Sequence, residues 1–529
     1  MALSARVGPD AVRDLGGFRR WAEAALPRGL AFLGPDPHHA LGFLDLVPRL
    51  HIAAADRPPA LDAVEALGAR CWTPTGRLRQ QEGPEAPGTS APHSRGPSPA
   101  LGERDGPLES RGAGEAIAAV QGAEEREIGR DSVSLAADPD FPSWLAGMGS
   151  GEGLPPVAVF KPSHRLEALA QAGGWRLLAA PAGLARQWEN KVAFRAKAAA
   201  LGLRQPAGQV LGPGDGFAAA AEQLGLPFVL QAPHGYSGAK TLLVDDAASF
   251  AAARETLRAP RLRATAWAVG MPLTLNACVT AKGVAMGAPC LQVTGEPGLT
   301  RHRLGSCGND WSWPDLSALD LSAYRRVTRI VGEAMGRDGF RGFFGLDFVQ
   351  DPVGSEPWLI EVNPRLVASA SLHAQLELLA GRLPLAARHL MALLDPAADA
   401  LPLDFHEAPL KGGQLILHNL GGGPRRWQGR LHAGRMPTTD QEAPADRLEP
   451  ACLLRQIGPA DCLLLPPPTG REIASGSEWG RIQSTASVTG AAGHPLPRLS
   501  RAVAGLLEAA GWPSKPELSL DVRPESDFV

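Results

Sequence analysis

The sequence lacks the features that mark secreted, membrane-spanning and nucleic-acid-binding proteins. No apolar run reaches the roughly 18–20 residues that cross a bilayer. The N-terminal segment has no basic stretch followed by an apolar one, so no signal peptide is evident. The net charge of −3 provides no global positive field for a polyanion. We therefore expect a cytoplasmic protein without a nucleic-acid or membrane partner.

Cysteine is scarce and scattered along the chain. The 529 residues include six Cys, and none of them forms a Cys-x-x-Cys pair. This spacing disfavours both a zinc site and a disulfide framework. The sequence also shows no identifiable Ser/His/Asp or Cys/His set, so a nucleophilic side chain is not indicated.

What the chain does contain is a pair of carboxylates on two predicted strands. The stretch 341–366 reads as two strands joined by a turn that is rich in Asp, Pro and Gly. The strands carry Asp347 and Glu361, and Asn363 and Arg365 follow at alternate positions on one face. Two carboxylates and an amide oxygen suit Mg²⁺, and a guanidinium beside them suits an anion. The spacing alone is equally compatible with a hairpin that has a solvated polar face.

The order of these features resembles the metal-binding signature of the ATP-grasp superfamily. In that family an acidic residue on one strand precedes a strand of the form hydrophobic-Glu-x-Asn-Pro-Arg, and IEVNPR at 360–365 is close to it. The resemblance implies two α+β subdomains that grip ATP, with Mg²⁺, or Mn²⁺ as an alternative, bound between them. It assigns the metal ligands Asp347, Glu361 and Asn363, and the catalytic residues Arg365 and Asn363.

Two further stretches resemble the nucleotide-binding part of the family. Asn190–Lys191 open a predicted helix at the place where the family has a phosphate-binding lysine. The loop HGYSGAK lies between two apolar strands, and its glycines would let backbone N–H groups approach an anion. The candidate cofactor-binding residues are therefore Lys191, Gln231, Gly235, Ser237, Gly238 and Lys240.

The sequence departs from the family pattern at two of these places. The strand before the loop usually ends in hydrophobic-Lys-Pro, but here it ends in Leu-Gln231-Ala-Pro, and glutamine supplies no charge. Lys240, at the far end of the loop, is the candidate substitute. The segment TAWAV at 265–269 lacks the acidic residue that the family places near adenine and ribose, which leaves an apolar wall for the base. Residues 262–295 read as a continuous β-meander, in which Asn276 and Gln292 are predicted to face the same site.

Composition divides the chain into four segments. Residues 76–140 are rich in Pro, Gly, Ser and charge, so we expect a disordered insertion there. The segments are an N-terminal parallel α/β domain of the pre-ATP-grasp type (1–75 and 141–180), the insertion (76–140), an ATP-grasp domain (181–396) and a small β-rich C-terminal domain (397–529).

Polar residues follow two strands of the predicted N-terminal domain. His38 and His39 come after the first strand, and Lys161 comes after a later one, at the edge where α/β folds bind ligands. Adjacent histidines cannot point to one site from a regular element, which favours a solvent-exposed position for this pair. A solvated strand end is likewise the commoner explanation for Lys161.

The resemblance implies a ligase that activates a carboxylate with ATP as an acylphosphate and joins it to an amine. Its partners would be small-molecule carboxylate and amine substrates, and a homodimer is an open alternative to a monomer. One competing hypothesis is a carboxylating enzyme similar to biotin carboxylase or to purine-pathway enzymes, which the absence of a Met-Lys-Met biotin-acceptor segment disfavours. Another is a non-catalytic descendant that binds nucleotide or nothing, as Gln231 and the missing acidic residue would suggest.

Overall fold

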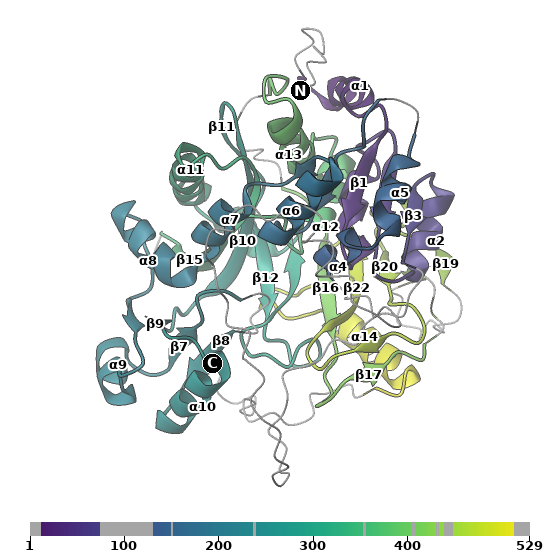
Figure 1. The fold of residues 1–529 in the computed structure, drawn as a ribbon. Helices are drawn as coiled ribbons and strands as arrows, with labels where there is room; N and C mark the ends of the chain where they lie inside the picture. Colours follow the sequence, from purple (N-terminus) through teal and green to yellow (C-terminus); the bar gives the residue numbers. More distant parts are fainter. Residues whose placement is uncertain are drawn as a thin grey trace, which may run out of the picture.

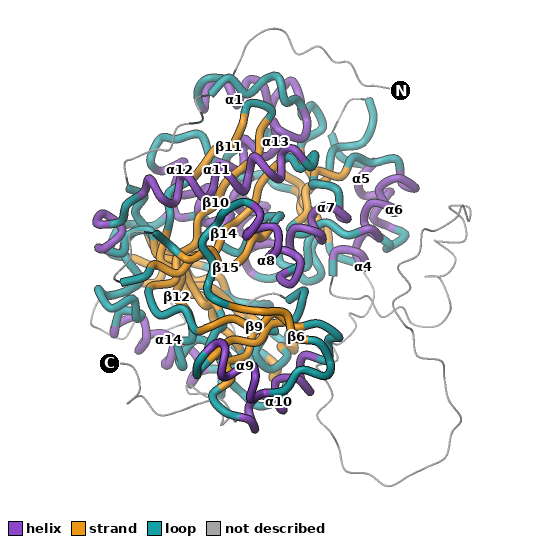
Figure 2. Tube along the Cα trace, turned by 90° about the vertical axis from the view of Figure 1, so that its left-hand side faces the viewer, coloured by secondary structure: helices purple, strands orange, loops and turns teal. Residues whose placement is uncertain are grey.

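Three main sheets organise the chain, one in the N-terminal part, one in a small lobe and one that runs through the centre (Figure 1). The computed structural model describes residues 12–512, apart from 75–130, 150–151, 236–239, 353–355, 402, 404–408, 430, 432 and 438–447. Figure 2 shows the small lobe at one end of the molecule and the helices α1 (Leu15–Ala25), α12 (Ala370–Leu379) and α13 (Leu385–Leu394) at the other.

The N-terminal sheet is parallel, with the strand order β3-β2-β1-β4-β5. Its central strands are short apolar runs that are buried throughout, which is typical of parallel sheets covered on both faces. The strands are β1 (Leu30–Leu33), β2 (Leu50–Ala53), β3 (Arg70–Trp72), β4 (Val157–Val159) and β5 (Leu177–Leu178). The further helical segments of this part are η1 (Pro37–Phe43), α2 (Pro59–Ala66), α4 (Ser132–Ala136), α5 (Asp140–Ala146) and α6 (His164–Gly173).

The predicted insertion at 76–140 lies mostly outside the described residues. Its last part does not fit a disordered segment, because α4 forms there. Asp131 caps this helix by accepting a hydrogen bond from the backbone N–H of Ser134, and Leu135 is fully buried. Composition missed this short helix because its two buried residues are diluted by a long polar stretch.

The small lobe is an antiparallel sheet of order β6-β9-β7-β8 with two helices on one face. Its elements are β6 (Gly208–Leu211), α9 (Phe217–Leu224), β7 (Phe228–Gln231), β8 (Thr241–Val244), α10 (Ala247–Leu257) and β9 (Leu262–Ala266). The prediction of one continuous meander over 262–295 is wrong, because β9 pairs with β6 and β7 rather than with the strands that follow it. Two helices, α7 (Ala182–Glu189) and α8 (Lys191–Ala200), precede this lobe.

The central sheet is antiparallel and continues without a break into the C-terminal part of the chain. Its path is β15-β14-β10-β12-β13-β16-β22-β20-β18-β19, and β11 pairs with β10. The C-terminal quarter is β-rich as predicted, and its strands extend the sheet that carries the two carboxylates. The strands are β10 (Met271–Thr280), β11 (Gly283–Met286), β12 (Cys290–Thr294), β13 (Ser306–Asp310), β14 (Gly342–Gln350), β15 (Trp358–Asn363), β16 (Gly413–His418), β18 (Gly434–Pro437), β19 (Glu449–Pro450), β20 (Asp461–Leu465) and β22 (Glu478–Ser484).

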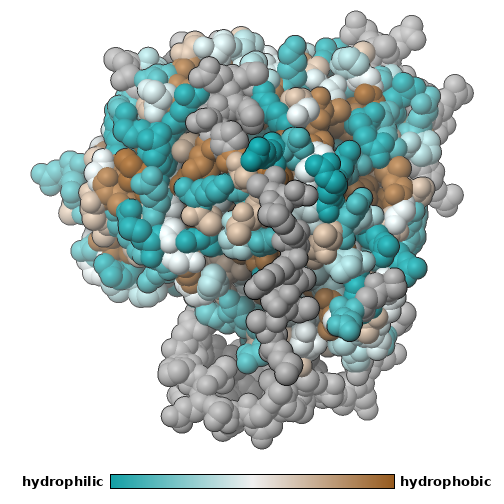
Figure 3. Space-filling model, turned by 90° about the horizontal axis from the view of Figure 1, so that it is seen from above, coloured by the Kyte–Doolittle hydropathy of each residue, from teal (hydrophilic) through white to brown (hydrophobic). Residues whose placement is uncertain are grey.

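Helices cover the central sheet. The amphipathic α11 (Leu321–Arg337) packs its apolar side on strands β10 and β14, where Tyr324 and Phe348 meet at 5.1 Å between ring centroids. The other elements are η2 (Pro314–Ala318), η3 (Leu454–Gln456), α14 (Pro497–Ala509) and the strand pair β17 (Arg425–Arg426) and β21 (Glu472–Ile473). Figure 3 shows that hydrophilic side chains are interspersed with small hydrophobic patches on the face that carries α1 and α13. In the part of the chain that the structure describes, no helix is long and apolar enough to cross a membrane.

A buried carboxyl group on α12 makes the stability of the fold depend on pH. Glu377 is 5% exposed and accepts a hydrogen bond from the backbone N–H of Leu385 at 3.0 Å. Burial raises the pKa of Glu377 from 4.5 to about 8. The stability that the protonated group contributes is therefore complete below its unfolded-state pKa of 4.5 and is lost as the pH rises through about 8.

We expect Glu377→Gln to stabilise the protein at alkaline pH. The amide mimics the protonated carboxyl group, so the free energy of unfolding should exceed that of the wild type by about 3 kcal/mol near pH 8, and the gain should shrink toward pH 5. Urea unfolding at several pH values measures this difference. The exposed Glu333→Gln on α11 is the control, and it should leave the pH profile unchanged. If the free energy of unfolding of Glu377→Gln varies with pH in parallel with that of the wild type, the raised pKa of Glu377 is contradicted.

Candidate metal and phosphate site

Asp347 and Glu361 face each other across the strand pair β14 and β15. They are directly paired in the antiparallel register. One oxygen of Asp347 accepts hydrogen bonds from Thr274 Oγ1 at 2.8 Å and from Gln292 Nε2 at 3.2 Å. Burial, and then the charge of Glu361, raise the pKa of Asp347. A cation between the two carboxylates would remove their mutual repulsion, so this donor set fits a divalent metal.

Lys191 compensates the charge of Glu361. Its Nζ lies 2.7 Å from Glu361 Oε2, and its side chain is 7% exposed. Lys191 is the first residue of α8 because Asn190 caps that helix by accepting a hydrogen bond from the backbone N–H of Ala193 at 3.0 Å. Burial acts to raise the pKa of Glu361, but Lys191 and Arg263 outweigh it and lower that pKa to about 2. Glu361 is therefore a carboxylate at neutral pH.

Asn363 and Arg365 lie beside the carboxylates, as the alternation along β15 predicts. The amide nitrogen of Asn363 donates to Asp347 Oδ2 at 2.9 Å, and its oxygen accepts from Arg365 Nη2 at 3.1 Å. The structure thus brings all four predicted residues of this stretch together. Ligation of a metal by Asn363 requires the amide to turn, because an amide binds a metal through its oxygen.

Glu189 holds the guanidinium of Arg365 in place. Arg365 Nε donates to Glu189 Oε1 at 3.2 Å, and Lys161 Nζ lies 2.7 Å from Glu189 Oε2. Burial acts to raise the pKa of Glu189, but Arg365 and Lys161 outweigh it, so the pKa is lowered. The Arg365 guanidinium also lies 5.4 Å from the ring of Phe160. Lys161 is therefore not merely a solvated strand end, because it neutralises the carboxylate that positions Arg365.

The predicted phosphate loop is described only in part. Ser237 and Gly238 lie outside the described residues. Gly235 packs so closely on Lys240 that a Cβ added there would lie 2.8 Å from Lys240 Cβ. Lys240 is exposed, and its carbonyl accepts a hydrogen bond from the backbone N–H of Ala232. The buried cation that touches Gln231 is not Lys240 but Arg263, whose Nε donates to Gln231 Oε1 at 2.8 Å.

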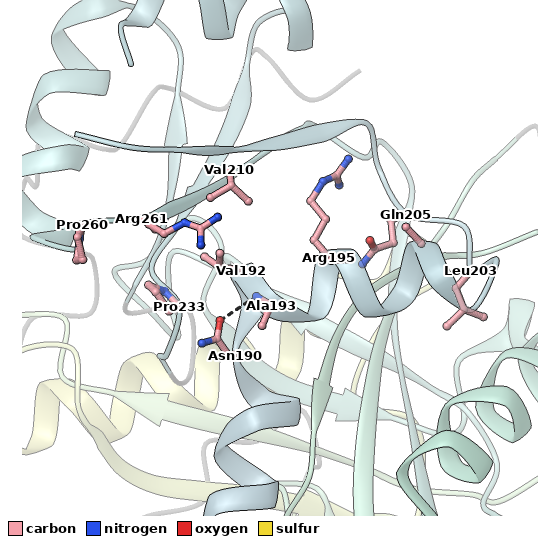
Figure 4. A pocket seen from close by; sticks show the side chains of 12 residues that line it. Asn190, Val192, Ala193, Arg195, Leu203, Gln205, Val210, Pro233, Pro260 and Arg261 are labelled. Carbon is pink, nitrogen blue, oxygen red and sulfur yellow. Dashed lines mark hydrogen bonds between the residues drawn. The ribbon is translucent and has the colours of Figure 1, made fainter. Parts of the chain in front are cut away.

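A cavity of about 800 Å³ opens between α8 and the small lobe (Figure 4). Its lining includes Asn190, which precedes Lys191, and Val210, which pairs with Arg263 across β6 and β9. The cavity therefore adjoins the charged site. The walls are mainly apolar, and Figure 4 shows the side chain of Arg261 lying between Val210 on the strand and α8. An apolar hollow beside a set of charged groups is typical of small-molecule binding sites.

The adjacent histidines are not the solvent-exposed pair that the sequence favoured. His38 is only 6% exposed, and the ring of His39 stacks on that of Phe160 at 4.0 Å between centroids. The reason is the close approach of η1 to α12, where a Cβ on Gly42 would lie 2.9 Å from Ser371 Cα. Both histidines belong to a 3-10 helix, whose tighter turn the spacing did not reveal.

Several site residues were missed or only partly recognised from the sequence. Gln292 does reach Asp347, as predicted, whereas Asn276 contacts Ser369 and His373 instead. Arg263 was missed, although the alternation of LRATA places its side chain opposite Leu262 and Ala264. That alternation was the available signal.

Comparison with known proteins identifies the architecture. No protein-family model and no curated protein matches the sequence. Biotin carboxylase of Campylobacter jejuni, in a β,γ-ATP complex, superposes with a TM-score of 0.52 at 12% identity, over 91% of this chain and 90% of the other. N5-carboxyaminoimidazole synthase of Aspergillus clavatus, with ADP and 5-aminoimidazole ribonucleotide, gives 0.50 at 14% identity, over 91% and 98%. Phosphoribosylamine–glycine ligase of Thermotoga maritima gives 0.50 at 12% identity, over 92% and 98%.

These similar structures are ATP-grasp ligases. The protein has the ATP-grasp fold. The predicted fold class is thereby confirmed, and the match extends over the parallel N-terminal sheet and the C-terminal strands as well as the central part. The charged site lies where β15 of the central sheet meets β9 of the small lobe. At these identities the likeness shows the fold, so the roles of individual residues stay predictions.

Proposed function

We propose that the protein is an ATP-dependent ligase that activates a carboxylate as an acylphosphate and joins it to an amine. The observation that supports this most directly is the convergence of Asp347, Glu361, Lys191 and Arg365 from separate elements onto one buried site beside an apolar cavity. Buried charges are costly unless they are paired or bind a ligand. A purely structural hairpin has no need of this arrangement.

The chain's own residues suit phosphoryl transfer. Mg²⁺, or Mn²⁺, held by Asp347, Glu361 and Asn363 would neutralise the charge that develops on the phosphates. Lys191 lies at the N-terminus of α8, where it would contact a phosphate group. Arg365, which Glu189 holds, would bind the carboxylate and stabilise the transferring group. Such catalysis consists of positioning and electrostatics, so no nucleophilic side chain is needed.

A carboxylating enzyme is the second candidate. Two of the similar structures are a biotin carboxylase and an N5-carboxyaminoimidazole synthase, and a related carboxylase domain was crystallised with bicarbonate. In that reaction bicarbonate takes the place of the organic carboxylate at Arg365. A homodimer is a further prediction, which light scattering on the purified chain would check.

The experiment that tests the function is a hydroxylamine trap. Purified protein is incubated with Mg·ATP, hydroxylamine and either a pool of organic acids and amino acids or bicarbonate alone. We expect ADP together with a hydroxamate whose mass identifies the carboxylate. ADP that depends on bicarbonate, without a hydroxamate of an organic acid, would favour the carboxylating alternative. AMP would reject the mechanism, and neither product, together with no thermal stabilisation by Mg·ATP, would favour a non-catalytic protein.

A further inference from the structure

Arg263 lies on the face of the small-lobe sheet that the helices α9 and α10 leave uncovered. Its neighbours Leu262 and Ala264 point the other way, into the apolar core beneath those helices. In the strand register Arg263 stands between Val210 of β6 and Gln231 of β7. The guanidinium is therefore on the side of the sheet that faces the cavity and the central sheet.

The Arg263 side chain connects the small lobe to the central sheet. Its Nε donates to Gln231 Oε1 and its Nη1 donates to the carbonyl oxygen of Ile360, each at 2.8 Å. Ile360 belongs to β15 and directly precedes Glu361. Gln231 presents its oxygen to Arg263 because its amide nitrogen donates to Thr241 Oγ1 at 3.0 Å. Gln231 thus fixes the orientation of the Arg263 guanidinium.

The charge of Arg263 is not neutralised by an ion pair as the other cations of the site are. Lys191 pairs with Glu361, and Arg365 pairs with Glu189. In the part of the chain that the structure describes, Arg263 forms no ion pair, and its Nη2 donates no hydrogen bond. The residue is 3% exposed. Its hydrogen-bond acceptors are neutral, and the charge of Glu361, which follows Ile360, acts on it only from beyond ion-pair distance. A buried guanidinium in these surroundings is stabilised further when an anion joins it.

We propose that Arg263 binds a phosphate group of the nucleotide through its free Nη2. It thereby holds the small lobe against β15, the strand that carries Glu361. This inference rests on the proposed function, because it takes the ligand to be a nucleoside triphosphate. It makes Arg263 a further catalytic-site residue. The positive charge that Gln231 cannot supply at the end of β7 comes instead from the neighbouring strand β9.

Nucleotide titrations of purified variants test the proposal. We expect Arg263→Gln to weaken the binding of Mg·ATP and Mg·ADP about 10–100-fold in Kd, and to leave the Kd of adenosine unchanged, because a charge-assisted hydrogen bond to phosphate is lost. The exposed Arg329→Gln on α11 carries the same charge change outside the site and should bind all three ligands like the wild type.

A second variant separates charge from structure. In Gln231→Lys/Arg263→Gln the positive charge moves one strand along, and we expect the binding of ATP to recover to within about tenfold of the wild type. If Arg263→Gln fails to fold, the comparison uses Arg263→Lys, which keeps the charge but has fewer hydrogen-bond donors. This variant should raise the Kd of ATP severalfold and leave the Kd of adenosine unchanged.

The outcomes separate this inference from the proposed function. A wild-type protein that binds no nucleotide would overturn both. Wild-type binding of ATP, with an Arg263→Gln Kd within twofold of it, would overturn only the role of Arg263. Equal weakening of ATP and adenosine, with no recovery in the double variant, would show that Arg263 serves the packing of the lobes alone.

Discussion

Glu361→Gln is expected to lower the rate of ADP formation by at least about a thousandfold while the protein stays folded. Of the two carboxyl groups at the predicted metal site, that of Glu361 has the lower pKa, because Lys191 and Arg263 keep it low despite burial. The amide retains the shape of the side chain and still offers an oxygen to Lys191 Nζ, but it removes one charge from the metal ligands. The measurement is a coupled assay of ADP with saturating Mg·ATP, together with the melting temperature of the variant.

The control for this variant lies on the same hairpin. Glu356 is half-exposed and pairs with Arg326 on α11, outside the set of site residues. Glu356→Gln should retain the wild-type rate, because it removes a surface ion pair that contributes little to stability. ADP formation by Glu361→Gln at the wild-type rate would refute the metal assignment. A large drop in melting temperature would instead show that Glu361 supports the fold.

The architecture could be predicted from the sequence wherever local pattern and tertiary packing agree. The buried strands β1 and β4 are short apolar runs between turn residues, and β14 and β15 are runs rich in aromatic and β-branched residues on either side of a Pro-containing turn. The strand β9 was assigned to the wrong sheet, because strand pairing is decided by contacts far apart in the chain and not by its own five residues. For the same reason the continuity of the C-terminal strands with the central sheet could not be seen.

The candidate site was predictable where its residues share one strand. Glu361 and Asn363 follow from the period of two along β15, and Arg365 lies two residues beyond the end of that strand. Glu189, Lys161 and Arg263 come from other elements, and their importance arises only from the partners that the fold gives them. Single charged residues next to apolar ones are common in any chain, so their sequence signal was weak. The motif therefore located the centre of the site but not the groups that orient it.

These orienting groups form a chain of charges across the site. Lys161 neutralises Glu189, Glu189 holds Arg365, and Arg365 touches the amide of Asn363, which in turn contacts Asp347. Each charged member has an opposite charge or a fixed dipole within hydrogen-bond distance. Preorganised groups of this kind stabilise developing charge without having to reorient during the reaction. The position of Arg365 should consequently matter as much as its charge.

Arg365→Gln is expected to lower hydroxamate formation by about a hundredfold or more, with little change in the Kd of Mg·ATP. The guanidinium contacts Glu189 and Asn363 and does not line the cavity beside α8, so we expect its loss to affect the transition state and leave the nucleotide bound. Kinetics in the hydroxylamine assay and a nucleotide titration measure the two quantities separately. A variant that loses both equally would mean that Arg365 binds the nucleotide.

The effect of Glu189→Gln then distinguishes position from charge at Arg365. This substitution keeps the hydrogen bond to Arg365 Nε but removes the charge that fixes both Arg365 and Lys161. We expect a loss of hydroxamate formation of roughly tenfold, smaller than that of Arg365→Gln, and no additional loss when the two substitutions are combined. If the loss in the combined variant equals the product of the two single losses, Glu189 acts independently of Arg365. Glu189 and Lys161 would then not serve to position Arg365.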